Sequence, residues 1–208
     1  MHTFKSVLVA LFLAALSNMD AQHIHYLSGT LNTGISKVRE PDSRFNLTYG
    51  GQFSYVFWEN PGWYLKYGLG FSSQASGIFE YPLLFDVSQE ELNKKTDMSY
   101  NRMDFYIPLQ GFFTFYRYRR ESFFALAGLE LNYSFREIYT HDEYGKVKVP
   151  FDDIDKRIKS AAMIGIGYQK EFSRLQYLNL YPSFSMELRA ERPFYAIKLN
   201  AEFIYALD

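Results

Sequence analysis

The chain has 208 residues, a formal net charge of −1 at pH 7 and no cysteine. The lack of cysteine excludes a disulfide scaffold, a thiol enzyme and a lipoprotein anchored through an N-terminal cysteine, and the near-zero charge gives no indication of a nucleic-acid partner. Aromatic residues make up 19% of the chain, yet its mean hydropathy is only −0.23, so apolar residues must be interleaved with polar ones.

The first predicted element is a secretory signal peptide over residues 1–21. An apolar run, VLVALFLAAL, follows the positive charge of Lys5. This run is shorter than the roughly 20 apolar residues that a transmembrane helix needs, but it suits the core of an export signal. Cleavage after Ala21 leaves residues 22–208, one domain by length. Cleavage after Ser17 and, for the whole segment, a buried N-terminal helix are the alternatives.

The rest of the chain alternates apolar and polar residues. The clearest segment, RFNLTYGGQFSYVFW, begins at Arg44 and keeps its apolar and aromatic residues at odd positions, with breaks at Val56 and at the terminal Trp58. Alternation with period two places the two sets on opposite faces of a strand. In chain order, such segments cover residues 25–35, 44–58, 63–71, 103–115, 123–136, 158–169, 177–188 and 195–205. The sequence therefore predicts an all-β, eight-stranded antiparallel up-and-down barrel.

Short and long connections alternate between these segments. One set is tight and lies at residues 59–62, 117–121 and 171–174; the first of these, Glu-Asn-Pro-Gly, has favourable turn residues. The other set includes two long connections and lies at residues 36–42, 74–101, 137–157 and 189–192. Outer-membrane barrels have short periplasmic turns and longer extracellular loops, so the pattern predicts a transmembrane barrel with both termini in the periplasm.

Alternation alone does not distinguish a membrane barrel from a soluble barrel that hides its apolar face inside. Here the apolar set is larger than a small interior can hold, since eight strands enclose space only for packed side chains. The opposite set is rich in Gly, Ser, Asn, Gln and charges of both signs. Aromatic residues also crowd the strand ends, where interfacial girdles are expected: Trp58, Trp63, Tyr64, Tyr116, Tyr118 and Tyr205. These features favour an apolar face toward lipid.

Three short stretches carry a family resemblance: DFYIPLQ at 104–110, FFALAGLELNYSF at 123–135 and MIGIGYQKEF at 163–172. They resemble the small outer-membrane β-barrel domain family, whose members are often labelled "porin family" or "PorT family" and share the eight-stranded barrel of the OmpA/OmpX type. The resemblance implies an eight-stranded antiparallel barrel and carries over no function.

Charged residues of both signs share the polar face of the predicted strands. The candidate lumen network comprises Arg44, Lys66, Asp104, Glu130, Arg136, Glu187, Lys198 and Glu202. Because eight strands leave an interior that side chains just fill, buried charges there must find opposite partners. The near balance of signs predicts an ion-paired plug that does not conduct, whereas a selective pore would more often show rings of one sign.

Enzymes known on small barrels of this kind, lipid A acyltransferases and deacylases, need a Ser/His-type constellation near the outer rim. His23 and His25 lie near the predicted periplasmic end, and His141 lies in a long connection with no serine nearby in sequence. The sequence therefore predicts no enzyme, no catalytic residues and no cofactor.

The acidic run Asp152-Asp153-Ile154-Asp155 is a weak candidate for calcium. It lacks the glycine and terminal glutamate of an EF-hand loop, and Lys156 and Arg157 follow it directly. A solvated loop is the better interpretation, and no metal site is predicted. Upstream, residues 138–149 show a strand–turn–strand pattern, which predicts a hairpin that extends the barrel wall above the membrane.

The connection after the third strand contains an apolar stretch at residues 77–85, followed by capping-box spacing for a short helix at Ser88–Glu91. Exposed apolar surface tends to mark binding sites, so the candidate partner loop comprises Ile78, Phe79, Tyr81, Leu83, Leu84 and Phe85. Packing of these side chains over the barrel mouth is the alternative.

Together these features predict a non-enzymatic integral outer-membrane protein of a Gram-negative bacterium, with a structural, surface-interaction or assembly role. Its expected partners are outer-membrane lipid and, through the extracellular loops, an envelope protein or a glycan. A narrow pore for small solutes and a soluble secreted barrel that binds an apolar ligand are the alternatives.

Overall fold

The computed structural model describes residues 25–39, 43–60, 62–82, 95–141, 145–148, 157–188 and 193–207. Nearly all of them lie in strands: β1 (His25–Val38), β2 (Ser43–Asn60), β3 (Trp63–Pro82), β4 (Lys95–Tyr118), β5 (Glu121–His141), β6 (Gly145–Lys148), β7 (Ile158–Ser173), β8 (Gln176–Glu187) and β9 (Phe194–Leu207). Within these residues, no helix is long and apolar enough to cross a membrane.

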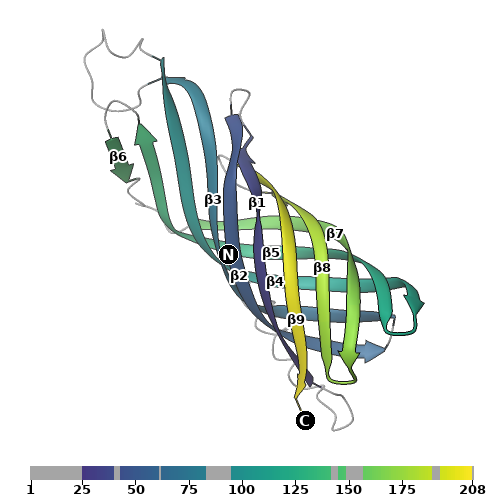
Figure 1. Ribbon diagram of the computed structural model, residues 1–208. Helices are drawn as coiled ribbons and strands as arrows, with labels where there is room; N and C mark the ends of the chain where they lie inside the picture. The colour runs from purple at the N-terminus through teal and green to yellow at the C-terminus, as the bar shows by residue number, and fades with distance from the viewer. Residues whose placement is uncertain are drawn as a thin grey trace.

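Eight of these strands close into a barrel (Figure 1). Neighbours in the ring are antiparallel, β1 pairs with both β2 and β9, and the pairing of β4 with β5 completes the closure. β6 pairs with β5 beyond the ring. The predicted eight-stranded, antiparallel, up-and-down fold is confirmed.

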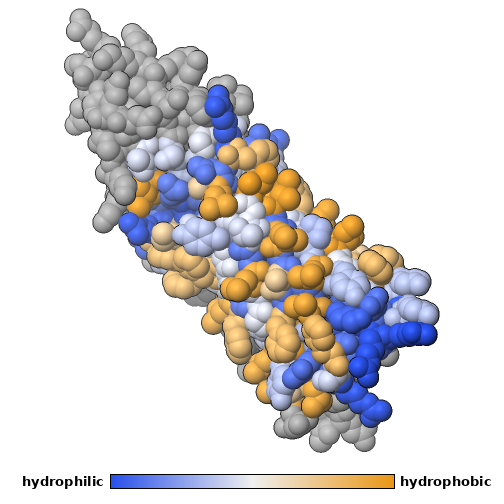
Figure 2. All heavy atoms as spheres, in the orientation of Figure 1, coloured by the Kyte–Doolittle hydropathy of each residue, from blue (hydrophilic) through white to orange (hydrophobic). Residues whose placement is uncertain are grey.

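The two faces of the barrel differ in polarity, as the strand β9 shows. Leu199 is 59% exposed on the outside, whereas its neighbour Lys198 is 5% exposed and faces the interior. Hydrophobic side chains cover much of the flank seen in Figure 2. A soluble barrel with an apolar ligand site requires the opposite arrangement, so the structure has the inside-out polarity of a membrane barrel.

Three neighbouring strands are longer than the rest. β3, β4 and β5 continue past the other strands toward the upper left of Figure 1, where β6 lies beside β5. The β5–β6 pairing sets Ile138 opposite Lys148 and Tyr139 opposite Val147, which confirms the hairpin predicted over residues 138–149. The barrel wall is therefore taller on this side.

The prediction that residues 74–101 form one long connection is wrong in part. β3 runs to Pro82 and β4 begins at Lys95, with Tyr81 opposite Thr96. Residues 77–82, predicted as a loop, are therefore part of the sheet. Alternation marks only strands whose two faces meet different surroundings, and this stretch, GIFEYP, does not alternate.

Several predicted features lie outside the described residues. They are the signal peptide at 1–21, His23, the apolar residues Leu83, Leu84 and Phe85, the capping box at 88–91 and the acidic run at 152–155.

The turn between β4 and β5 holds an arginine in an unusual backbone conformation. Arg119 and Arg120 form a two-residue turn, since Tyr118 pairs with Glu121, and Arg119 has a φ of 54°. Positive φ at the first turn residue is normally left to glycine or asparagine. The left-handed region costs a residue with a Cβ roughly 1–2 kcal/mol, so this turn is strained.

We therefore expect Arg119→Gly to raise the free energy of unfolding by about 1 kcal/mol, because glycine adopts this φ without strain. Arg120→Gly is the matched control, because the backbone at Arg120, unlike that at Arg119, does not have a positive φ. Glycine at 120 therefore only increases the conformational entropy of the unfolded chain, which lowers stability. Urea unfolding of both variants in phospholipid vesicles measures the difference. Equal destabilisation by both would show that the turn is not strained.

The barrel interior as the candidate functional site

The interior of the barrel is filled by side chains in successive layers. Inward positions alternate with outward ones along every strand, so each strand contributes to several layers. The short-turn end, where residues 62, 119–120 and 174–175 connect the strands, has an apolar layer. Polar and charged layers follow, and a second apolar layer lies at the long-connection end.

The layer at the short-turn end, here the floor cluster, is aromatic. It comprises Tyr26, Val56, Tyr64, Phe112, Phe124, Leu126, Met163, Tyr181, Ile204 and Ala206, with Trp58, Leu175 and Tyr177 packed against it. Tyr64 stacks on Phe112 with ring centroids 4.4 Å apart. The interior of this end is therefore occupied by rings.

The prediction that Tyr64 and Trp58 belong to an outer aromatic girdle is wrong. Tyr64 is 1% exposed, and Trp58 packs on the floor cluster. The sequence held a signal for this layer in adjacent aromatic pairs, because neighbours on a strand face opposite ways. In Phe112-Phe113 and Phe123-Phe124, one ring faces inward and the other outward.

Above the floor cluster lies a fully buried ion pair. The Lys66 Nζ of β3 is 2.7 Å from the Glu202 Oε1 of β9, and both side chains are 0% exposed. Lys66 also donates to the Tyr181 hydroxyl at 3.3 Å and lies 4.9 Å from the Phe112 ring centroid. The ammonium group therefore has one carboxylate partner in otherwise aromatic surroundings.

Amide side chains connect this pair to the neighbouring strands. Asn179 Nδ2 donates to Glu202 Oε2 and to the Tyr64 hydroxyl, each at 2.9 Å. Gln169 Nε2 donates to Asn179 Oδ1 at 2.9 Å, and Ser122 donates to Gln169 Oε1 at 3.2 Å. This chain of bonds holds Glu202 Oε2, while Oε1 accepts from Lys66, so both carboxylate oxygens have a partner.

A second charged layer centres on Arg102 of β4, which is fully buried. Its Nε donates to Asp104 Oδ2 at 2.8 Å, and its Nη1 donates to Glu187 Oε2 at 3.1 Å, with Nη2 bonding the other Glu187 oxygen. Gln74 Oε1 accepts from Nη2 at 3.4 Å. Two carboxylates therefore share one guanidinium, in the two-pronged geometry that arginine favours.

Lys159 of β7 and Glu137 of β5 extend this layer, which then holds three carboxylates and two basic groups. Ser134 Oγ donates to Asp104 Oδ1 at 2.6 Å and accepts from Lys159 Nζ at 3.1 Å. Lys159 Nζ also lies 2.6 Å from Glu137 Oε1. The network therefore runs across the interior from β8 through β4 and β5 to β7.

The long-connection end has its own apolar layer, here the cap cluster: Val38, Tyr100 and Phe194, with Tyr139 packed against them. Tyr100 stacks on Tyr139 and on Phe194, at 4.7 and 5.4 Å between centroids. The Arg102 guanidinium carbon lies 4.5 Å from the Phe194 ring centroid. The cap cluster therefore covers the second charged layer.

Glu130 and Lys198 lie between the two charged layers. They are 6% and 5% exposed, and Lys198 Nζ lies 5.9 Å from the Tyr106 ring centroid. Glu130 interacts electrostatically with Lys198 and Lys66 and with the acids of the second layer. The structure thus places six of the eight predicted network residues inside the barrel: Lys66, Asp104, Glu130, Glu187, Lys198 and Glu202.

The other two, Arg44 and Arg136, are exposed on the outside, which corrects their predicted lumen positions. The reason is a β-bulge in each strand. On β2 the register shifts between Phe45 and Tyr49. On β5, Arg136 pairs with Met103 and Ser134 pairs with the next residue of β4, Asp104, so Phe135 is the extra residue. An extra residue reverses which positions face inward.

Three inward charged residues were missed by the sequence reasoning. Arg102 lies directly before the predicted fourth strand, 103–115, and extending the alternation by one residue finds it. Lys159 lies at an odd position of the predicted segment 158–169, as do the inward-facing residues of that segment. Glu137 has no such signal, because the bulge at Phe135 turns it inward in place of Arg136.

Within the described residues, no group of three or more His, Asp or Glu side chains is arranged to hold a metal ion. His25 lies at the short-turn end and is hydrogen-bonded through Nδ1 to the Tyr55 hydroxyl. The side chain of His141 is not among those the structure describes.

No protein-family model and no curated protein matches the chain. Solved structures do match. Neisserial surface protein A is 9% identical to this chain, and the match covers 88% of this chain and 97% of the neisserial protein, with a TM-score of 0.54. Ail, the attachment invasion locus protein of Yersinia pestis, is 13% identical over 88% and 100%, with a TM-score of 0.45. The outer membrane protease OmpT of Escherichia coli is 10% identical over 89% and 97%, with a TM-score of 0.45.

At these identities the likeness concerns the fold alone. The chain shares the closed antiparallel barrel of neisserial surface protein A, in agreement with the predicted eight-stranded architecture. Membership of the "porin family" or "PorT family" stays a prediction.

Proposed function

We propose that this chain is a non-enzymatic integral protein of a Gram-negative outer membrane, exported through its signal peptide. In this proposal the barrel does not conduct, and its role is structural, in surface interaction or in assembly. The observation that supports it is the inside-out polarity: charges pair in the interior, while large apolar side chains such as Leu31, Leu69 and Phe53 are 74%, 66% and 62% exposed.

The layered interior supports a closed lumen. An ion entering from either end meets rings first, the cap cluster at one end and the floor cluster at the other. Between them, Lys66 and Arg102 are already paired with carboxylates, so the part of the interior that the structure describes offers no ring of one sign to select a permeating ion. An eight-stranded barrel leaves no space for an aqueous channel beside such side chains.

The taller wall formed by β3, β4, β5 and β6 supports the surface-interaction role. In this wall β3 runs to Pro82 and β4 begins at Lys95, beyond the ends of the other strands (Figure 1). We therefore retain the stretch from Ile78 to Phe85 as the segment that contacts an envelope protein or a glycan.

Single-channel recording in planar bilayers tests the closed lumen. The unmodified protein is expected to give no open-channel steps, with insertion verified by the different gel mobility of boiled and unboiled samples. A variant with Tyr64, Lys66 and Arg102 all replaced by serine is the matched control, because emptied layers admit water. Steady, reproducible steps from the unmodified protein would contradict the closed lumen and favour a narrow pore.

A further inference from the structure

The short-turn end carries basic side chains on adjacent turns. Arg117 belongs to β4, Arg119 and Arg120 to the β4–β5 turn, Lys170 to β7 and Arg174 to the β7–β8 turn; together they are named the basic rim here. The Glu171 amide donates to the Arg120 carbonyl at 2.8 Å, and Arg120 Nη1 donates to the Phe172 carbonyl at 3.4 Å. These bonds hold the two turns side by side.

Two of the five basic groups are paired with acids. Arg117 Nη2 lies 3.4 Å from Glu171 Oε2, and Lys170 is hydrogen-bonded to Glu121. Among the described residues, no salt bridge involves the remaining three, Arg119, Arg120 and Arg174, all of which are exposed. The basic rim therefore carries excess positive charge.

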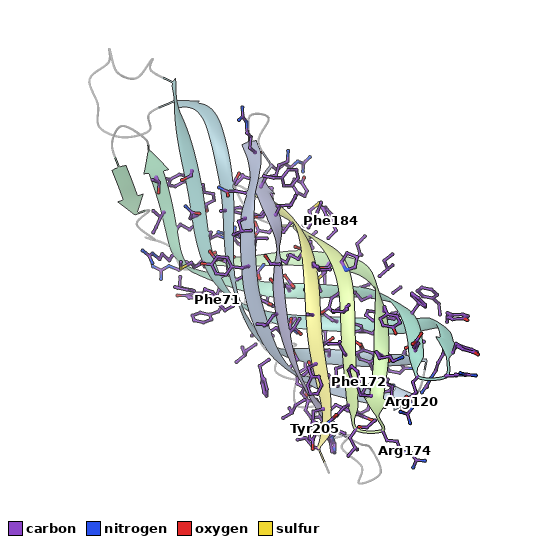
Figure 3. All side chains as sticks on the ribbon, in the orientation of Figure 1. Phe71, Arg120, Phe172, Arg174, Phe184 and Tyr205 are labelled. Carbon is purple, nitrogen blue, oxygen red and sulfur yellow. The ribbon has the colours of Figure 1, made fainter. Side chains whose placement is uncertain are left out.

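The basic rim borders an exposed aromatic surface. Phe115, Tyr116, Tyr118 and Phe172 are each more than half exposed. Figure 2 shows hydrophilic side chains gathered at the lower right, beyond the hydrophobic flank, and Figure 3 labels Arg120 and Arg174 at that end, close to Phe172. Exposed Tyr and Phe at strand ends mark the interface of a membrane barrel, so the arginines lie at the level of lipid headgroups.

The strained turn between β4 and β5 also supports a functional role for the basic rim. Arg119 occupies a left-handed position that glycine would fill without strain, and its guanidinium carbon lies 5.2 Å from the exposed Tyr118 ring centroid. Backbone strain that persists at an exposed turn motivates a functional hypothesis for the residue that bears it. Here that residue adds a cation to the basic rim.

We propose that the basic rim binds the phosphate groups of anionic phospholipids in the leaflet next to the short turns. The proposal rests on the membrane location proposed above. Arginine binds phosphate through paired N–H donors, and basic residues beside a membrane attract anionic headgroups. A lipid fits better than an acidic protein because the same surface continues into exposed aromatic side chains, which suit the membrane interface.

Spin-labelled lipids test the proposal directly. The purified protein is reconstituted in phosphatidylcholine bilayers containing trace spin-labelled phosphatidylglycerol or phosphatidylcholine, and electron paramagnetic resonance measures the motionally restricted fraction of each. We expect phosphatidylglycerol to be preferred at low salt, with the preference weakened at high salt. Arg119→Gln combined with Arg174→Gln should lower the preference by roughly two- to fivefold.

The charge-matched control is Arg39→Gln combined with Arg136→Gln, which removes two exposed arginines outside the short-turn end. It should leave the preference nearly unchanged. An equal loss in both double variants, or no preference in the unmodified protein, overturns the proposal. If neither lipid shows a restricted fraction, the barrel is not embedded in the bilayer and the proposed membrane location fails instead.

Discussion

Replacing Glu202 with alanine is expected to lower the free energy of unfolding by about 3–5 kcal/mol. The substitution leaves the Lys66 ammonium, 0% exposed, without the carboxylate that lies 2.7 Å away. Its remaining close neighbours are the Tyr181 hydroxyl and the rings of Phe112 and Tyr181, which compensate only part of the lost pairing. Asn179 also loses an acceptor.

Two controls separate burial from charge. Glu121→Ala breaks the Lys170 pair, whose side chains are 37% and 45% exposed, and should change stability by no more than about 1 kcal/mol. Lys66→Met combined with Glu202→Leu removes both charges and should recover most of the loss. Denaturant unfolding in vesicles, followed by tryptophan fluorescence, measures all three. A loss for Glu202→Ala as small as that for Glu121→Ala would show that water reaches Lys66 and that the lumen is open.

The fold could be predicted from the sequence because the barrel separates two environments. On β9 every second residue from Tyr195 to Tyr205 is apolar or aromatic, and the structure exposes that set while Lys198, Asn200 and Glu202 face inward. Such a pattern is readable one strand at a time. Residues 77–82 of β3, GIFEYP, do not alternate, so this part of the strand was missed.

The pairs inside the barrel could not be predicted in this way. Lys66 and Glu202 are separated by 136 positions, and which strands face each other across the interior depends on their tilt and stagger. Bulges add a second difficulty, because one extra residue exchanged Arg136 for Glu137 at the inward position. Arg102, which joins Asp104 to Glu187, was missed because it precedes the clear alternation. The sequence predicts the composition of the network, and the geometry of the closed barrel decides its partners.

Leu199→Arg should lower the free energy of unfolding in phospholipid vesicles by about 2–4 kcal/mol, because Leu199 is 59% exposed near the middle of β9 and the arginine would meet the hydrocarbon core. Leu207→Arg is the matched control: the same strand and outward face, 42% exposed, but at the short-turn end, where the expected loss is about 0–1 kcal/mol. On a surface facing water, neither arginine would cost much. A dependence on depth therefore identifies lipid as the solvent of the outer face. Urea titrations of both variants in vesicles measure it, and equal small losses would contradict the membrane location.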